Sequence, residues 1–144
     1  MTFRRILIAV DESPVASYAA EVGLELSRAL QGELALVHVQ TAPVSYGTET
    51  GVPPSELMAL AKTEGRTLLA RIRERLSLPD SAQQFLLAGV PATEIVEAAR
   101  GWAAEVIVIG SHGRGGMRRA LLGSVAEAVM RQAHCPVLVV RGKD

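Results

Sequence analysis

Glycine and hydroxyl residues gather in one part of the chain, in a pattern suited to binding phosphate. Residues 110–116 run Gly-Ser-His-Gly-Arg-Gly-Gly, and Gly123 and Ser124 follow at the start of a segment with helical periodicity. Glycine lets the backbone approach a ligand closely. The first N–H groups of a helix attract an anion. The pattern predicts a polyphosphate site that includes Gly110, Gly113, Gly123 and Ser124.

Basic side chains accompany these glycines. Arg114, Arg118 and Arg119 lie between Gly110 and Gly123, and no acidic residue lies between them. We expect Arg114 and His112 to lie near the phosphates. Arg118 and Arg119 fit a solvated surface equally well, which is the usual place of a charge run.

Two familiar nucleotide motifs are absent from the sequence. The turn after the first apolar run is Asp11-Glu12-Ser13 and holds no glycine, so the Gly-x-Gly-x-x-Gly fingerprint of dinucleotide-binding folds is missing. No Gly-x-x-x-x-Gly-Lys-Ser/Thr sequence occurs either, which excludes a P-loop protein.

A hydrolytic site and a metal site built from protein side chains alone are both disfavoured. Ser111, His112 and Asp11 are the residue types of a hydrolytic triad, but the Gly-x-Ser-x-Gly elbow is missing. We also expect that adjacent residues do not place the serine Oγ on the histidine ring. The three histidines lack the spacing of metal ligands. No catalytic residue and no metal ligand is predicted, although Mg²⁺ can arrive with a nucleotide, held by its phosphates and water.

The segments that must position these residues alternate between two spacings of apolar side chains, that of buried strands and that of helices. Short apolar runs predict buried parallel strands at 6–10, 34–39, 85–88, 106–109 and 137–140. Helical patterns cover Pro14–Leu30 and Pro54–Leu76, with shorter apolar stripes at 95–102 and 125–133. The apolar face of the first helix is Val15, Ala19, Val22, Leu26 and Leu30, and Gly32 is expected to end this helix. Pro14 and Pro91 are expected at the first positions of their helices. Residues 1–144 therefore form one α/β domain, an open five-stranded parallel sheet of Rossmann-like type with helices on both faces. Thr41–Pro53 has no period and is expected to form a long loop.

Composition limits the partners and the compartment. Fifteen basic residues balance fifteen acidic ones. The protein therefore has no net positive charge that would favour binding to nucleic acid or to an anionic membrane. No apolar run approaches the roughly 20 residues needed to cross a bilayer. Cys135 is the only cysteine, which excludes an internal disulfide and fits a reducing compartment. We expect a cytoplasmic protein.

The spacing Gly110-x2-Gly113-x9-Gly123-Ser124 resembles the ATP-binding signature of the universal stress protein family. Further matching strings are Val10–Ser13, His38-Val39, Gly89–Pro91, Leu121–Val125 and Cys135–Val140, so the resemblance covers the whole chain. It implies a strand order of 3-2-1-4-5. In that order the first and fourth strands are neighbours, and Asp11 and Gly110 lie at the mouth of one crevice.

The resemblance also implies a role for each matching residue. Asp11 should accept hydrogen bonds from ribose hydroxyls, Val39 should meet adenine with its backbone, and Ala9 and Val10 should pack beside the base. The implied phosphate ligands are Gly110, Gly113, Gly123, Ser124 and the N–H of Val125. Asp11 also fits a capping role at the first helix, and His38 fits a structural role at a strand end.

By resemblance, the protein binds ATP, with AMP and ADP as alternatives, and acts as a nucleotide-dependent regulatory module in a stress response. A slow ATPase or self-phosphorylating protein, and an interaction protein with incidental nucleotide binding, are the alternatives. Binding is favoured because no carboxylate or glutamine lies between Gly110 and Gly123 to orient water. Glu127, one helical turn past the start of the last helix, is the further acid whose side chain can reach back. The family also implies a homodimer through the uncharged edge strand 137–140. The protein partner and the stress signal stay open.

Overall fold

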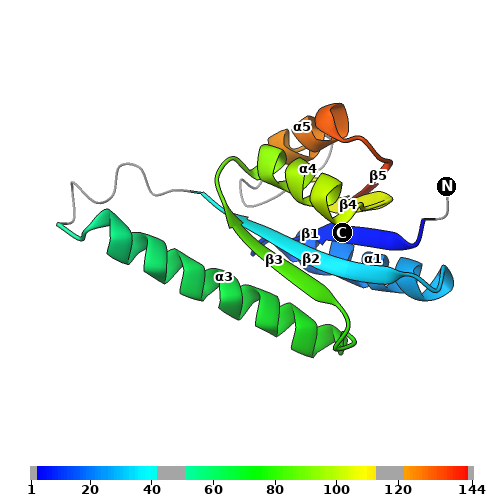
Figure 1. The fold of residues 1–144 in the computed structure, drawn as a ribbon, viewed down its shortest axis with the longest axis horizontal. Coiled ribbons are helices and arrows are strands. Elements are labelled where there is room, and N and C mark those ends of the chain that lie inside the picture. The colour runs from blue at the N-terminus through cyan, green and yellow to red at the C-terminus, as the bar shows by residue number, and fades with distance from the viewer. Residues whose placement is uncertain (1–2, 42–50, 113–121, 143–144) are drawn as a thin grey trace.

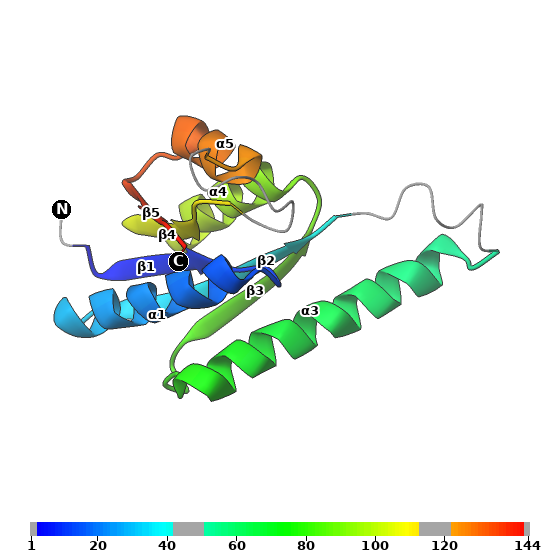
Figure 2. The same cartoon turned by 180° about the vertical axis from the view of Figure 1, so that it is seen from behind.

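A parallel sheet of five strands lies between two layers of helices (Figures 1 and 2). The computed structural model describes residues 3–41, 51–112 and 122–142. In chain order the elements are β1 (Arg5–Ala9), α1 (Pro14–Ala29), β2 (Glu33–Gln40), α3 (Pro54–Leu76), β3 (Gln83–Ala88), α4 (Pro91–Trp102), β4 (Val106–Gly110), α5 (Ser124–Gln132) and β5 (Val137–Val140). The strand order is β3-β2-β1-β4-β5, which confirms the predicted α/β fold and its order.

The predicted element boundaries differ from the observed ones by one or two residues at most ends. β5 and α3 have the predicted limits, whereas β2 and β3 also include polar residues at their ends, among them Glu33, Gln40 and Gln83. Ladder hydrogen bonds do not require apolar side chains, so a strand continues past the apolar run that reveals it. Of the predicted loop, Thr41 and residues 51–53 have no regular structure, and residues 42–50 lie outside the described part.

The core consists of two clusters, one on each face of the sheet. Ile6 and Ile8 of β1 pack toward α1 and α3, and Leu7 and Ala9 pack toward α4 and α5. Successive side chains of a strand point to opposite faces, so β1 supplies both clusters. The central strands are therefore buried on both faces, as parallel sheets require.

α1 buries a face that differs from the predicted one. Leu30 was expected on this face but is 38% exposed, while Ala20 and Gly23 are buried. A Cβ at Gly23 would lie 2.4 Å from Ile8 Cδ1, so α1 approaches the sheet along its small residues. The prediction followed the largest apolar side chains and missed this close approach.

The end of α1 also corrects a prediction. Gly32 was expected to stop the helix, but Gln31 adopts the left-handed conformation, with φ 52°. Gly32 N–H donates to Ser27 O at 2.8 Å and Gln31 N–H to Arg28 O at 3.2 Å, the two bonds of a Schellman motif. Gly32 is needed for a different reason, because a Cβ there would lie 2.4 Å from Arg4 O.

The first turns of α3 extend beyond the edge of the sheet (Figure 1). Met58 and Leu60 in these turns are 53% and 59% exposed, whereas Leu68, Leu69 and Ile72 further along the helix are buried. None of the helices in residues 3–41, 51–112 and 122–142 is both long and apolar enough to cross a membrane.

Candidate functional site

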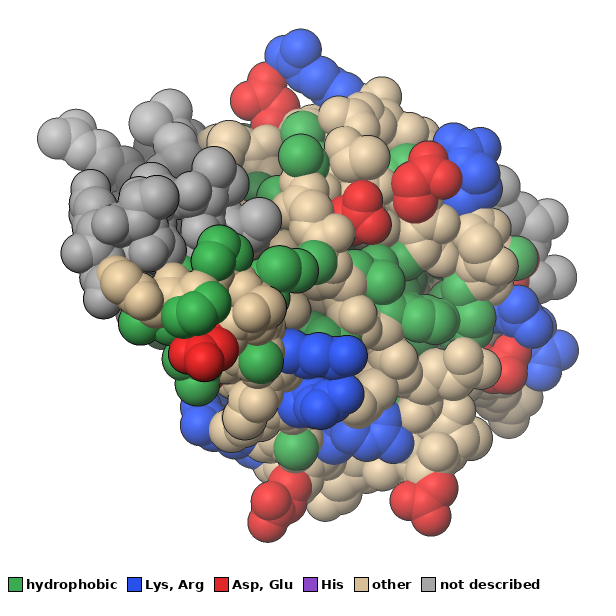
Figure 3. Space-filling model, turned by 60° about the vertical axis from the view of Figure 1, so that its left-hand side comes forward, with side chains coloured by type: hydrophobic (Ala, Val, Ile, Leu, Met, Phe, Trp, Pro, Cys, Tyr) green, Lys and Arg blue, Asp and Glu red, His purple; other side chains and the backbone are tan. Residues whose placement is uncertain are grey.

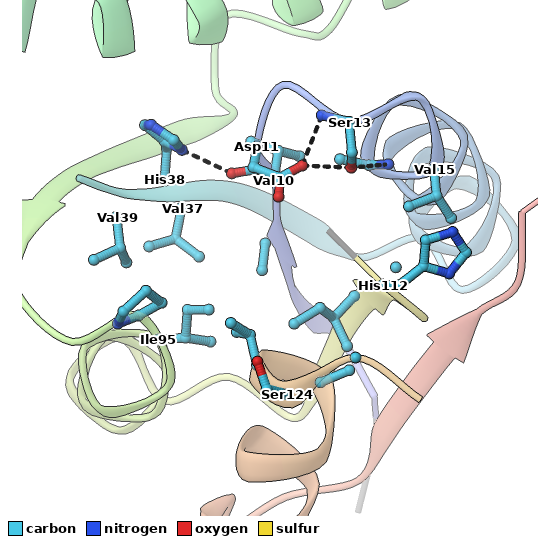
Figure 4. A pocket seen from close by; sticks show the side chains of 18 of the residues that line it. Val10, Asp11, Ser13, Val15, Val37, His38, Val39, Ile95, His112 and Ser124 are labelled. Carbon is cyan, nitrogen blue, oxygen red and sulfur yellow. Dashed lines mark hydrogen bonds between the residues drawn. The ribbon is translucent and has the colours of Figure 1, made fainter. Parts of the chain in front are cut away.

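One pocket lies at the carboxyl ends of the central strands (Figure 4). Its volume is about 370 Å³. It brings together most of the residues that were predicted to bind nucleotide, namely Ala9, Val10, Asp11, Val39, Gly110, His112, Gly123, Ser124 and Val125. Gly113 and Arg114 were predicted with them and lie outside the described residues, as do Arg118 and Arg119.

The position of the pocket follows from the strand order. β1 pairs with β2 on one side and with β4 on the other, and Ala9 is in register with Ile109. The connections after β1 and β4 lead to opposite faces of the sheet, because α1 and α5 belong to different layers. The crevice between these connections is the place where open α/β sheets bind ligands.

Asp11 is held in place by Ser13, the residue before α1 (Figure 4). Its Oδ1 accepts hydrogen bonds from Ser13 N at 2.8 Å and from Ser13 Oγ at 2.5 Å. Ser13 is the N-cap of α1, and its Oγ accepts a hydrogen bond from Ala16 N at 3.3 Å. Helix capping therefore belongs to Ser13, and Asp11 orients the capping side chain. Both bonds use one carboxylate oxygen.

His38 connects β2 to the segment that carries Asp11. Its ring is buried, and Nδ1 lies 2.9 Å from Val10 O. A carbonyl oxygen only accepts, so Nδ1 carries the proton and donates it. Val10 N–H donates to Val37 O at 2.9 Å, so both backbone groups of Val10 are paired with β2. The residue before Asp11 is thereby fixed, which agrees with a structural role for His38.

We expect His38→Leu to lower the free energy of unfolding by about 1–3 kcal/mol, because the buried Val10 carbonyl loses its donor. Chemical denaturation measures this change. His134→Leu is the matched control, because the same substitution is made at an exposed side chain. Equal unfolding free energies for the two variants would contradict the role given to His38.

Two glycines of the predicted signature let backbone segments come close together. A Cβ at Gly110 would lie 2.9 Å from Val15 Cγ1. A Cβ at Gly123 would lie 2.8 Å from His112 Cα, and Gly123 N–H donates to Ser111 O at 2.6 Å. Gly123 is the N-cap of α5, so the start of this helix is held directly against the end of β4. Ser124, the first residue of α5, is exposed at the pocket.

The expectation that Ser111 Oγ does not meet the His112 ring was wrong, because Oγ lies 3.1 Å from Nδ1. The chain bends at Ser111 and His112. Ser111 N–H donates to Val140 O at 2.7 Å, which continues the β4–β5 pairing, while its carbonyl accepts from Gly123. Ser111 is buried, however, and it does not line the pocket. The contact orients the ring of His112 and does not expose a nucleophile.

Two further side chains near the site have defined environments. Glu127 Oε1 lies 2.6 Å from Arg131 Nη2, one turn further along α5, so the carboxylate points away from the start of the helix. Cys135 is half-buried, and burial raises the pKa of its thiol. A raised pKa reduces the thiolate fraction at neutral pH and agrees with a packed, unreactive thiol.

Sequence reasoning missed several residues that line the pocket. α4 supplies Pro91 and Ile95, and β2 and the residue after it supply Val37 and Thr41. Ile95 had appeared only as an apolar position on a helix. Pro91 begins a helix directly after β3, and helices that follow parallel strands begin at the edge where ligands bind. This rule could have placed Pro91 and the first turn of its helix at the pocket.

A family model described as the universal stress protein family matches residues 2–141. The chain belongs to the universal stress protein family. It is 36% identical to universal stress protein MJ0531 of Methanocaldococcus jannaschii, over 96% of this chain and 82% of that protein. It is 33% identical to universal stress protein YxiE of Bacillus subtilis, over 96% of this chain and 99% of that protein.

Solved structures have the same fold as this universal stress protein. The structure of hypothetical protein MJ0577 superposes with a TM-score of 0.81 at 28% identity, over 100% of this chain and 99% of that one. Universal stress protein UspA from Lactobacillus plantarum superposes with a TM-score of 0.84 at 21% identity, over 98% and 99% of the two chains. The family model and the curated relatives confirm the predicted family, and these structures confirm its fold.

Proposed function

We propose that this universal stress protein binds ATP in the pocket at the carboxyl ends of β1, β2 and β4, and that it acts as a nucleotide-dependent regulatory module in a stress response. One observation carries the proposal. A fixed carboxylate, that of Asp11, and the glycine-capped start of α5 line the same pocket. The first group suits vicinal hydroxyls, and the second suits phosphates.

Each part of the nucleotide has a partner in this proposal. Asp11 Oδ2 accepts from the ribose hydroxyls, because Oδ1 already accepts both bonds from Ser13. The backbone of Val39 meets adenine, with Ala9 and Val10 beside the base. The phosphates lie against Gly110, Gly113, Gly123, Ser124 and the N–H of Val125, with His112 and Arg114 nearby.

Other universal stress proteins support the choice of an adenine nucleotide. One with this fold was solved in complex with cAMP, at 19% identity and a TM-score of 0.70. Another, from Archaeoglobus fulgidus, was solved in complex with dAMP, at 24% identity and a TM-score of 0.61. ATP is the form we propose here because the spacing Gly110-x2-Gly113-x9-Gly123-Ser124 resembles the ATP-binding signature of the family.

Mg²⁺ arrives with ATP in this proposal and is held mainly by the phosphates and water. Among the described residues, no group of three or more His, Cys, Asp or Glu side chains lies together in a way that could hold a metal ion. We place the protein in the cytoplasm, where ATP is abundant and a lone thiol such as Cys135 stays reduced.

The test is the nucleotide that purified protein carries and prefers. Denatured protein should release an adenine nucleotide, and ATP should bind at least about tenfold more tightly than GTP, a difference of 1.4 kcal/mol. Asp11→Asn should weaken ATP binding by about tenfold or more, because a hydrogen bond to a charged group is lost. The asparagine Oδ1 still accepts from Ser13, so the cap is retained. Equal affinity for ATP and GTP would contradict the placement of adenine at Val39.

We also propose a homodimer through β5. This strand is the outer one beside β4, it carries no charge, and Leu138 at its centre is 39% exposed. Uncharged edge strands invite pairing. We expect light scattering at micromolar concentration to give twice the 15.3 kDa of one chain. Leu138→Lys should give the monomer mass with unchanged circular dichroism. A parent protein that scatters as a monomer would remove the proposal.

A further inference from the structure

A second cavity lies at the opposite edge of the sheet, between β3 and α4. Its volume is about 370 Å³. Phe85 and Leu87 of β3 and Trp102 of α4 supply its apolar lining, and Glu94 and Glu97 of α4 supply carboxylates. Figure 3 looks onto this side of the molecule, where apolar side chains line a hollow with acidic side chains beside it. None of these residues lines the nucleotide pocket.

We call this cavity the groove beside β3. Its aromatic side chains are held in place by contacts with each other and with Arg5. The rings of Phe85 and Trp102 meet edge to face, with centroids 6.4 Å apart. The Arg5 guanidinium lies 5.6 Å from the centroid of the Trp102 ring, and its Nη1 donates to Trp102 O at 2.7 Å. Arg5 is itself held by Glu33 at 3.2 Å. A ligand therefore meets a preformed surface, which reduces the entropy lost on binding.

The outer edge of β3 borders this groove and lacks the usual protection. β3 is the last strand on its side of the sheet, and within the described residues no strand pairs with its outer edge. Its residues, Gln83–Ala88, include no charge and no proline, the devices with which proteins block edge strands. Such an edge can accept a further strand, whose backbone supplies the hydrogen bonds and whose alternate side chains enter neighbouring pockets.

The two faces beside this edge carry opposite charges. Glu94 and Glu97 lie on the α4 face. On the α3 face, Arg73 Nη1 donates to Ala82 O, directly before β3, at 2.8 Å. Arg66 lies two turns before Arg73 on the same side of α3. A Cβ at Gly65 would lie 2.6 Å from Leu86 Cδ1, so this part of α3 is next to β3.

We propose that β3 accepts an extended segment of a partner protein, with Lys or Arg side chains facing the groove and acidic side chains facing α3. In a strand, successive side chains point to opposite faces. A segment in which basic and acidic residues alternate can therefore place its basic side chains toward Glu94 and Glu97 and its acidic side chains toward α3. A second copy of this chain offers no such pattern, because both edge strands, Gln83–Ala88 and Val137–Val140, are uncharged. The partner is therefore a different protein.

The experiment uses the full chain and the peptide Lys-Glu-Val-Thr-Lys-Glu-Val, which places lysine on one face and glutamate on the other. Trp102 is the only tryptophan, so its fluorescence reports on the groove directly. The control peptide, Lys-Val-Glu-Thr-Lys-Val-Glu, has the same composition with both charges on one face. We expect the first peptide to bind about tenfold more tightly, since each exposed ion pair strengthens binding by up to about fivefold. Equal binding of the two peptides would overturn the proposal.

Two variants with one control variant, and one modified peptide, test the position and the mode of binding. Gly101→Leu should abolish the fluorescence response, because Gly101 lines the groove and has open space around its Cβ, so the fold tolerates the side chain. Its melting temperature should not fall. The double change Glu94→Gln and Glu97→Gln should weaken binding about tenfold, whereas Glu127→Gln, on α5, should leave it unchanged.

A peptide N-methylated at alternate positions should lose binding, because it cannot form a ladder of hydrogen bonds. Retained binding would mean that side chains alone occupy the groove and would overturn strand addition. Self-association that Gly101→Leu abolishes would identify a second copy as the occupant and would also overturn the proposal. ATP should change none of these affinities, so failure here is distinguishable from failure of the nucleotide site.

Discussion

Gly123→Val is expected to weaken ATP binding at least about 100-fold, a loss of roughly 3 kcal/mol. A Cβ at this position would lie 2.8 Å from His112 Cα and 3.0 Å from Ser111 O. Both contacts are to backbone, which cannot rotate away, so the start of α5 must move off the end of β4. The N–H groups that we assign to the phosphates move with it. Isothermal titration calorimetry measures the loss.

The same substitution at Gly101 is the control. A Cβ at Gly101 meets nothing within 4 Å, so Gly101→Val should bind ATP as the parent does. Far-UV circular dichroism of Gly123→Val should match the parent, because the shift is confined to the start of a short helix. Its stability should fall by about 1–3 kcal/mol, as is usual for an overpacked site. Equal ATP affinity of Gly123→Val and the parent would contradict the assignment of the phosphates to this loop.

Bound ATP is expected to persist, with turnover at least about 1,000-fold below the roughly 10 per second of a typical enzyme. Hydrolysis needs a group that orients the attacking water. Among the described residues that line the pocket, Asp11 is the only acid, and its Oδ1 is occupied by Ser13. Glu127 was the most plausible further candidate from the sequence, but its carboxylate is paired with Arg131.

Single-turnover hydrolysis of labelled ATP with Mg²⁺ measures this rate. Glu127→Gln, Ser124→Ala and His112→Gln test two side chains that line the pocket and the acid in the first turn of α5. We expect Glu127→Gln to hydrolyse ATP at the slow rate of the parent. Several turnovers per second in the parent, lost in Glu127→Gln or His112→Gln, would make the protein an ATPase and contradict the binding-module proposal.

The periodicity of the sequence was sufficient to predict the elements and their layering. The strand at 137–140 and the helix Pro54–Leu76 were predicted at their observed limits, and Pro14 and Pro91 were correctly expected at the first positions of their helices. These features depend on residues close together in the chain, whose side chains and missing N–H groups act locally. The glycine spacing likewise identified Gly110, Gly123 and Ser124, which line the pocket because the strand ends bring them to one edge.

Contacts between distant segments were decided only by the tertiary structure. The sequence indicated neither that small residues bring α1 against Ile8 nor that His38 donates to Val10 O. It also left undecided the direction of the Glu127 carboxylate, and the expectation drawn from it that Ser111 does not meet the His112 ring was wrong. The groove beside β3 exists because a helix and an edge strand, each ordinary by itself, leave space between them. Local sequence determines which elements form, whereas the packing of their side chains determines how closely those elements approach and which polar groups meet.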